Sequence, residues 1–357
     1  MNDATSPQSE RAPRSVAPRP DRIAVVVNGN ARSVTSEVIS TIDQILLGGD
    51  IFVSRRLEEG PELARTIVNR GYGTVLTGGG DGTFTAVVSD VVREAQRQNK
   101  PIPRFGFLKL GTGNALAWVV GASGGKRRGL AADIQRLRED AGSRAVRFVE
   151  VEDLIAPFAG FGVDAVVLSD YDIVKRQLLQ TPLRRVAAGP VSYLVSTVTR
   201  SLPSYFLRAV PHCRIVNDGA DAFRIGSKGS ILGPPIPKGH TIYEGPARIA
   251  AVSTIPYFGF GFRAFPYAEE RPDRMSLRIS VITPIPFVLN FRGIWRGEYE
   301  NPNHIFDYLV EAVVFEFDPP TLFQIGGDAR GERARVRAAL SPTTIRLVDF
   351  YAPPNAA

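Results

Sequence analysis

A glycine-rich turn between an apolar run and an amphipathic segment limits the folds open to this chain. Residues 74–83 read TVLTGGGDGT, so a run of β-branched and apolar residues ends in glycines around one carboxylate, Asp81. Apolar side chains then recur at helical spacing over residues 84–96, which predicts a helix. Main-chain N–H groups of such a turn and helix start can approach an anion closely. We interpret the stretch as a phosphate cradle that also holds an acid, although an ordinary strand-to-helix turn favours the same residue types.

The first third of the chain alternates short apolar runs with amphipathic segments. The expected strands are residues 22–28, 51–54 and 104–110, and the run that enters the glycine turn is a further strand. The expected helices are residues 34–47, 61–70, 84–96 and 115–120. This alternation predicts a parallel sheet with helices on its faces. Ligands bind such sheets where strands end and helices begin. Polar or glycine turns stand at three of these ends, in residues 28–32, 78–83 and 111–114, and we expect them to form one site.

The pattern changes near residue 147. A basic glycine loop, residues 121–128, lacks the spacing of a P-loop and is predicted to be a surface loop. Beyond residue 147, short strands alternate with Gly and Pro turns, as in a sandwich, and helices are expected up to about residue 180 and over residues 191–206.

The predicted fold class is therefore α/β with two domains, a doubly wound parallel-sheet nucleotide domain and a β-rich sandwich domain. We expect a disordered arm over residues 1–20, the first domain over 21–146 and the second over 147–357. The last strand, residues 344–350, could return to either domain.

Charge and cysteine content narrow the classes of function. The formal net charge of +7 favours anionic partners. The basic residues are dispersed without an aromatic platform, which argues against nucleic acid. A single cysteine, Cys213, excludes an intrachain disulfide and fits a reducing, cytoplasmic compartment. Since no apolar run reaches the roughly 18 residues of a spanning helix, any membrane contact is expected to be peripheral.

A further glycine turn with an acid stands near the end of the chain. Residues 322–331 read LFQIGGDARG, so an alternating strand stops at two glycines followed by Asp328. This repeats the device of residues 74–83. An ordinary hairpin is the alternative, because Gly and Asp suit type I′ turns.

Taken together, these motifs resemble the diacylglycerol kinase catalytic-domain family of lipid kinases, which includes sphingosine and ceramide kinases. The resemblance covers nearly everything after residue 21. Its most specific parts are GGDGT at residues 79–83 and GTGN at residues 111–114. GGDGT alone is shared with NAD kinases and phosphofructokinases, whereas GTGN is similar to the lipid kinase version. Weaker similarities follow in the expected order, at residues 28–32, 162–165, 257–268 and 326–328.

The resemblance implies a magnesium- and ATP-dependent kinase that phosphorylates a hydroxyl group of a lipid, such as diacylglycerol or a sphingoid lipid, at a membrane surface. Asp328 falls where the family's catalytic carboxylate stands, and Asp81 would orient the Mg²⁺ bound to ATP. Asp164 and Asn114 would bind the acceptor, although Asp164 also suits a helix N-cap. By position, the residues that would line ATP are Asn28, Asn30, Ser54, Gly78, Gly79, Gly80, Asp81, Gly82, Thr83 and Thr112.

The chain departs from the family pattern in three places. Asn28-Gly29 replaces the usual Asn-Pro, and Asp328 replaces a Glu that commonly follows Asp-Gly. Residues 273–278 stand where bacterial members hold a structural magnesium ion, but they place an arginine near the second acid. We expect that metal site to be absent or replaced by an ion pair.

Two alternatives remain open from the residues alone. One is a non-catalytic sensor that binds nucleotide or lipid, since the usual Asp-Gly-Glu is missing. The other is an NAD kinase-like enzyme with a soluble acceptor, although the residues that follow GTG count against it. Neither the identity of the lipid nor the oligomeric state, a homodimer included, follows from the sequence.

Overall fold

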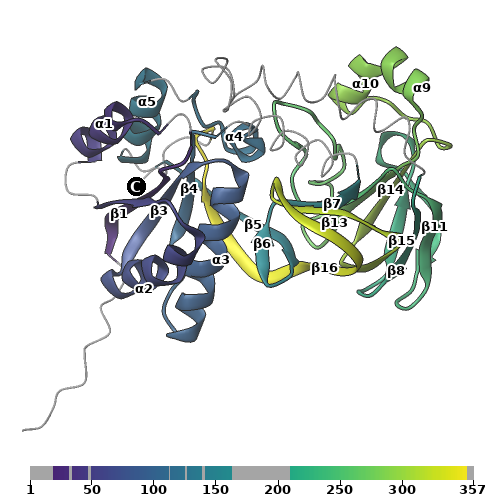
Figure 1. Cartoon of the computed structure of the whole chain (residues 1–357), viewed down its shortest axis with the longest axis horizontal. Coiled ribbons are helices and arrows are strands. Elements are labelled where there is room, and N and C mark those ends of the chain that lie inside the picture. The colour runs from purple at the N-terminus through teal and green to yellow at the C-terminus, as the bar shows by residue number, and fades with distance from the viewer. Residues whose placement is uncertain are drawn as a thin grey trace, which may run out of the picture.

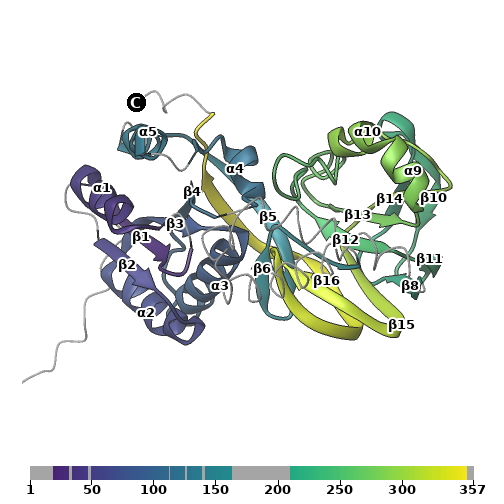
Figure 2. The same cartoon turned by 45° about the horizontal axis from the view of Figure 1, so that its top comes forward.

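A computed structural model of the chain describes residues 19–31, 34–46, 50–111, 113–124, 127–138, 141–162 and 210–351. Two lobes lie side by side, and one extended sheet runs through both (Figures 1 and 2). We call the described residues within 19–142 the first lobe and those within 143–342 the second lobe. The last strand of the chain then returns to the first lobe.

The first lobe is a parallel sheet with helices on both faces. Its strands are β1 (Arg19–Asn28), β2 (Asp50–Ser54), β3 (Tyr72–Gly79) and β4 (Arg104–Lys109), and its helices are α1 (Ser36–Leu46), η1 (Leu57–Glu59), α2 (Gly60–Arg70), α3 (Asp81–Arg97), α4 (Ala115–Val120) and α5 (Arg127–Arg138). The strand order is β2-β1-β3-β4, and all these pairs are parallel. Helices α1 and α5 cover one face, while α2 and α3 cover the other (Figure 1). The turns that leave the strands therefore gather at one edge of the sheet.

Local sequence sets the helix ends in this lobe. Helix α2 has Pro61 in its first turn, where a missing N–H costs nothing. It stops at Gly71, whose φ of 66° is a left-handed conformation that glycine adopts readily. Helix α3 starts directly after the glycine turn, with Gly80 as its N-cap.

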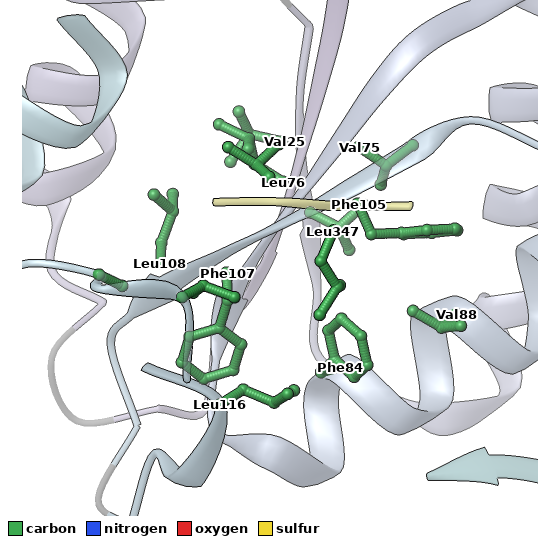
Figure 3. Close-up of a cluster of buried hydrophobic side chains, with 14 of the residues drawn as sticks. Val25, Val75, Leu76, Phe84, Val88, Phe105, Phe107, Leu108, Leu116 and Leu347 are labelled. Carbon is green, nitrogen blue, oxygen red and sulfur yellow. The ribbon is translucent and has the colours of Figure 1, made fainter. Parts of the chain in front are cut away.

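The core of the first lobe fills both faces of the sheet, with α1 and α5 on one side and α3 on the other, and Figure 3 shows part of it. Phe84 from α3 meets Phe105 of β4 edge to face, with ring centroids 6.5 Å apart, and meets Phe148 at 5.5 Å. Leu347, near the end of the chain, stands opposite Phe105 in the sheet. Each such buried side chain contributes about 1.5–3 kcal/mol relative to its exposed state. Phe148 and Leu347 come from distant segments, so this core depends on residues beyond the first lobe.

The second lobe is built mainly of antiparallel strands. Its elements are β5 (Ser143–Val151), β6 (Leu154–Ala156), β7 (Phe158–Gly162), β8 (His212–Asn217), β9 (Ala222–Ile225), η4 (Ser227–Gly229), β10 (Ile231–Ile236), β11 (Thr241–Pro246), β12 (Ile249–Ser253), β13 (Met275–Ser280), α9 (Pro284–Leu289), α10 (Phe291–Arg296), β14 (Ile305–Val310) and β15 (Ala312–Ile325). The strand order is β10-β9-β14-β13-β12-β7-β15. Phe161 anchors the core, with its ring 4.4 Å from that of Phe317 and 4.7 Å from that of Phe323.

The last strand, β16 (Asp328–Val348), ties the two lobes together. It pairs with β15 as a long hairpin and with β5 over much of its length. At its far end, Leu347 pairs in parallel with Phe105 of β4. One strand thus carries Asp328 at one end and extends the sheet of the first lobe at the other.

The fold class predicted from the sequence is confirmed, with a parallel α/β lobe followed by a strand-rich lobe. The expected strands and helices around the glycine turns are all present. Helix α5 was not predicted, and it begins at Arg127 inside the expected basic loop. The helices expected up to residue 180 and over residues 191–206 lie outside the described residues. Within the described part of the chain, every helix is too short or too polar to cross a bilayer.

Candidate functional site

The first glycine turn joins β3 to α3 through closely packed backbone. A methyl group on Gly79 would lie 2.7 Å from Cβ of Thr83, and one on Gly78 would lie 2.8 Å from Cγ1 of Val27. Any larger residue would push these neighbours apart. The first N–H groups of α3 have no acceptor within the helix and stand at its positive end. This geometry suits an anion such as a phosphate group.

The turn after β1 is joined to this helix start by a side-chain hydrogen bond. Asn28 donates from Nδ2 to Oγ1 of Thr83 at 3.2 Å, and its Oδ1 accepts from the N–H of Asn30 at 2.9 Å. Asn30 in turn donates to the carbonyl of Arg55 at 2.7 Å. Ser54, at the end of β2, donates to the carbonyl of Arg56 at 3.2 Å. The residues predicted at these turns therefore form a connected row from α3 outward to β2.

The second glycine motif lies directly against the first. A methyl group on Gly111 would lie 2.5 Å from the nitrogen of Gly80 and 2.8 Å from the carbonyl oxygen of Gly79. Asn114 holds the loop closed, because its Oδ1 accepts from the N–H of Gly111 at 3.1 Å and its Nδ2 donates to the carbonyl of Gly111 at 2.6 Å. The Asn114 amide, predicted to face the acceptor, is thus engaged within its own turn. Thr112 lies outside the described residues.

Asp81 links the two motifs through both of its oxygens. Oδ2 accepts from the N–H of Ala115 at 2.8 Å, and Oδ1 accepts from the N–H of Leu116 at 3.1 Å. These donors are the first residues of α4, so a side chain at the start of α3 caps a different helix. Burial raises the pKa of Asp81 to about 6, and the nearby charge of Asp328 adds to the rise. This positioning role was not foreseen, and no local pattern connects residues 34 positions apart.

Asp328 stands over the start of α3. It follows a turn in which Gly326 and Gly327 have φ angles of 57° and 85°, which favour glycine. A methyl group on Gly82 would lie 2.6 Å from the carboxyl carbon of Asp328. The hairpin tip is anchored to β7, because Gly326 donates its N–H to the carbonyl of Phe158 at 2.9 Å. The two acids named from the sequence, Asp81 and Asp328, therefore share one site although they belong to different lobes.

A loop of the second lobe also reaches the second glycine motif. Phe260 donates its N–H to the carbonyl of Gly113 at 2.9 Å. Nearby, the Tyr257 ring lies 6.1 Å from that of Trp118, and Nζ of Lys109 lies 5.1 Å from the same Trp118 ring. The loop was noted in the sequence only as a similarity, without an assigned contact. Asp164, the other predicted acceptor residue, lies outside the described residues.

The stretch considered for a structural metal carries ion pairs. Asp273 lies 2.7 Å from Arg274 and 3.2 Å from Arg271. Arg278, which stands near the position of the second acid, donates to both carboxylate oxygens of Asp307 at 2.7 and 2.8 Å. Among the described residues, no group of three or more His, Cys, Asp or Glu side chains is arranged to hold a metal ion.

The contact between the two glycine motifs yields a first testable prediction. Gly111→Ala should lower the free energy of unfolding by about 1–3 kcal/mol, because the new methyl group overlaps the backbone of Gly79 and Gly80. Nucleotide affinity should fall with it. Gly124→Ala is the matched control, since a methyl group there meets no atom of the described residues within 4 Å. Urea unfolding and ATP titration measure both effects, and equal behaviour of the two variants would contradict the contact.

The raised pKa of Asp81 predicts a pH-dependent stability. Its carboxyl ionises near 3.8 in an unfolded chain but at about 6 in the folded protein. Folding therefore favours the neutral form, and this stabilisation is complete below about pH 4 and is lost as the pH rises through about 6. We expect the unfolding free energy to fall by about 3 kcal/mol over this range relative to Asp81→Asn. Urea unfolding of both proteins measures the difference, and a pH-independent difference would argue against a buried, ionising Asp81.

Comparison with known proteins agrees with this geometry. Residues 22–145 match the family model of the diacylglycerol kinase catalytic domain. Two solved structures of a candidate diacylglycerol kinase from Bacillus anthracis str. Sterne share the fold. One has a TM-score of 0.62 at 13% identity and covers 94% of this chain and 98% of that one. The other has a TM-score of 0.61 at 12% identity and covers 92% of this chain and 97% of that one.

The likeness to these structures, at such low identity, concerns the fold. No curated protein sequence matches the chain. The family assignment therefore depends on the sequence match over the first lobe, which contains both glycine motifs. It confirms the family resemblance predicted from those motifs. The similarity to the diacylglycerol kinase catalytic domain is therefore established for residues 22–145 of this chain.

Proposed function

We propose that this kinase transfers the γ-phosphoryl group of ATP to a hydroxyl group of a lipid, such as diacylglycerol or a sphingoid lipid, at a membrane surface. The observation that carries the proposal is the position of Asp328. An acid from the strand-rich lobe lies against Gly82, at the start of the helix that would receive the phosphates. Phosphoryl transfer requires the acceptor hydroxyl to lie next to the γ-phosphate of ATP.

The first lobe would hold the nucleotide. The N–H groups at the start of α3 suit the phosphates, and Asn28 and Thr83 already face each other beside that start. The glycines of the turn leave no side chain between backbone and ligand. Asn30 and Ser54 would lie further along the same row, and Thr112 would complete the second motif.

The residues present fit a magnesium ion bound to the phosphates of ATP. Asp81 offers carboxylate oxygens, which are the ligands that Mg²⁺ prefers. The ion, when bound, neutralises charge on the phosphates. Asp81 acts mainly by holding the start of α4 through Ala115 and Leu116, which keeps both glycine motifs in register.

Asp328 would work on the acceptor. Its carboxylate accepts the proton of the lipid hydroxyl, or orients that hydroxyl in line with the γ-phosphate, as the oxygen attacks phosphorus. Assistance by such a base is worth about 10²–10⁴-fold in rate. Asp164 and Asn114 are proposed to bind the polar head of the acceptor, and Asn114 would do so through the turn that it closes.

The test is transfer of labelled phosphate from ATP by the full chain with Mg²⁺ present. The acceptor panel contains diacylglycerol, monoacylglycerol, sphingosine, ceramide and phosphatidylglycerol, with NAD as a soluble acceptor. We expect labelled lipid product with at least one lipid and none with NAD. Labelled NADP would favour an NAD kinase-like enzyme instead. Tight ATP or lipid binding without any transfer would favour a sensor, and either result would overturn the proposal.

A further inference from the structure

The helix pair α9–α10 carries the largest group of exposed apolar side chains in the described part of the second lobe. Ile285 is 73% exposed, Leu289 is 78% exposed, and they lie one turn apart on α9. Phe291 and Trp295 follow on α10, with 47% and 36% of their surfaces exposed. Burial of such side chains is normally favourable, so a cluster of them on the surface indicates a partner.

This apolar tip, which we define as Ile285, Leu289, Phe291 and Trp295, is held in place by the fold. Ile294 of α10 is buried, and the Trp295 ring stacks on Phe262 at 5.3 Å with an interplanar angle of 22°. The carbonyl of Trp295 also accepts from the N–H of Arg263 at 3.0 Å. The Phe291 ring lies 5.6 Å from that of Trp295. The packing of α10 against the rest of the second lobe therefore holds these exposed side chains in position.

The charged side chains on α9 and α10 themselves are basic. Residues 281–297 contain Arg292 and Arg296 and no acidic residue. Both arginines are exposed, and so is Arg263, whose backbone contacts α10. Two acids, Glu298 and Glu300, follow α10; Glu298 is exposed, and Glu300 accepts from the N–H of Lys228 and the hydroxyl of Tyr267. Aromatic and aliphatic side chains beside arginines match the boundary of an anionic bilayer, where the apolar groups enter and the arginines meet lipid phosphates.

We propose that the α9–α10 tip docks the protein on anionic lipid bilayers by inserting its apolar side chains between headgroups. This inference rests on the proposed lipid kinase function, because it says how the enzyme reaches an acceptor in a membrane. Phe262, on which Trp295 stacks, follows Gly261, and a methyl group on Gly261 would lie 3.1 Å from the Trp118 ring of α4, the helix that the second glycine motif precedes. Docking by the tip would therefore place the membrane near the loop that reaches the candidate site.

Tryptophan fluorescence reports insertion directly. The chain has only two tryptophans, Trp118 and Trp295. In the full-length Trp118→Phe variant the signal therefore comes from Trp295 alone. We expect a blue shift, and quenching by brominated lipid, with vesicles of equal parts phosphatidylglycerol and phosphatidylcholine. Much weaker changes are expected with phosphatidylcholine alone. An unchanged spectrum with the anionic vesicles would overturn the proposal.

Variants at the tip separate insertion from general charge attraction. Ile285→Ser with Leu289→Ser should weaken vesicle binding at least about tenfold, because two exposed apolar side chains are lost. Arg292→Glu should weaken binding to anionic vesicles about fivefold or more. The control for the serine variant is Ile285→Leu with Leu289→Ile, which keeps the tip apolar. The control for the charge change is Arg335→Glu, which makes the same change at an exposed side chain of β16. Equal binding by tip variants and controls would overturn the docking surface.

Failure of this inference is distinguishable from failure of the proposed function. Phosphorylation of a short-chain, water-soluble diacylglycerol needs no docking, so the serine variant should retain it while losing turnover on vesicles. Equal loss on both acceptors would point to damage at the site and would overturn the docking role. A parent protein that binds vesicles through Trp295 yet phosphorylates no lipid would leave the docking surface standing and reject the kinase proposal.

Discussion

Asp328→Asn should lower the turnover number for lipid phosphorylation by about 10²–10⁴-fold. The amide keeps the size of the side chain but cannot accept the hydroxyl proton. The residue is exposed at the hairpin tip, so the free energy of unfolding should change by less than about 0.5 kcal/mol. Affinity for ATP should stay nearly constant, because the amide occupies the same place over Gly82. Initial-rate kinetics with varied ATP and lipid measure these quantities separately.

Asp328→Glu is the informative companion. It keeps a carboxylate and should retain far more activity than the asparagine variant. If the asparagine variant changed only lipid affinity while its turnover number was preserved, Asp328 would be a binding residue. Proton acceptance would then have to be assigned elsewhere.

Asp81→Asn should also abolish most activity, but by another route. An amide offers one acceptor oxygen where the carboxylate offers two, so the N–H of Ala115 or of Leu116 loses its partner. An unpaired buried N–H costs about 1–3 kcal/mol, which favours movement of the second glycine motif away from the first. A displacement of about 1 Å near reacting groups can cost about 10²-fold in rate. Nucleotide affinity should therefore fall together with turnover, unlike in Asp328→Asn.

Asp133→Asn is the matched control for this variant. Asp133 is also a buried acid that accepts a backbone N–H, from Ser123 at 2.7 Å, but it lies on α5. The amide keeps one acceptor oxygen for that N–H, so the turnover of folded enzyme should not change. Calorimetry together with rates normalised to folded protein makes the comparison. Full activity in Asp81→Asn would remove that residue from the mechanism, and equal rate losses in both variants would reduce its role to stability.

Much of the first lobe could be predicted because its signals are local. Apolar runs, the proline of α2 and the glycines after β3 each specify a strand, a helix start or a turn within a few residues. Helix α5 was missed although it carries a local signal, since Leu130, Ile134 and Leu137 recur at helical spacing and are buried. The glycines and basic residues before it are typical of a surface loop, which is why a loop was predicted there.

The contacts that assemble the site were less accessible from the sequence. Asp81 reaches Ala115 and Leu116 only because β3 and β4 are neighbours in the sheet. Asp328 reaches Gly82 only because the β15–β16 hairpin crosses between lobes. Such contacts depend on pairings between distant segments, which no single stretch encodes. The motifs gave the residue types, and the topology gave their neighbours.

The position of strand β16 determines where the chain can be truncated. The region that matches the kinase family stops at residue 145, before Phe148 and Leu347 enter its interior. A fragment that ends there would expose an unpaired edge of β4 and leave a cavity beside Phe84. The unpaired edge favours aggregation, and the cavity lowers stability. Folding of the first lobe thus requires Phe148 and Leu347 as well as the residues that match the family.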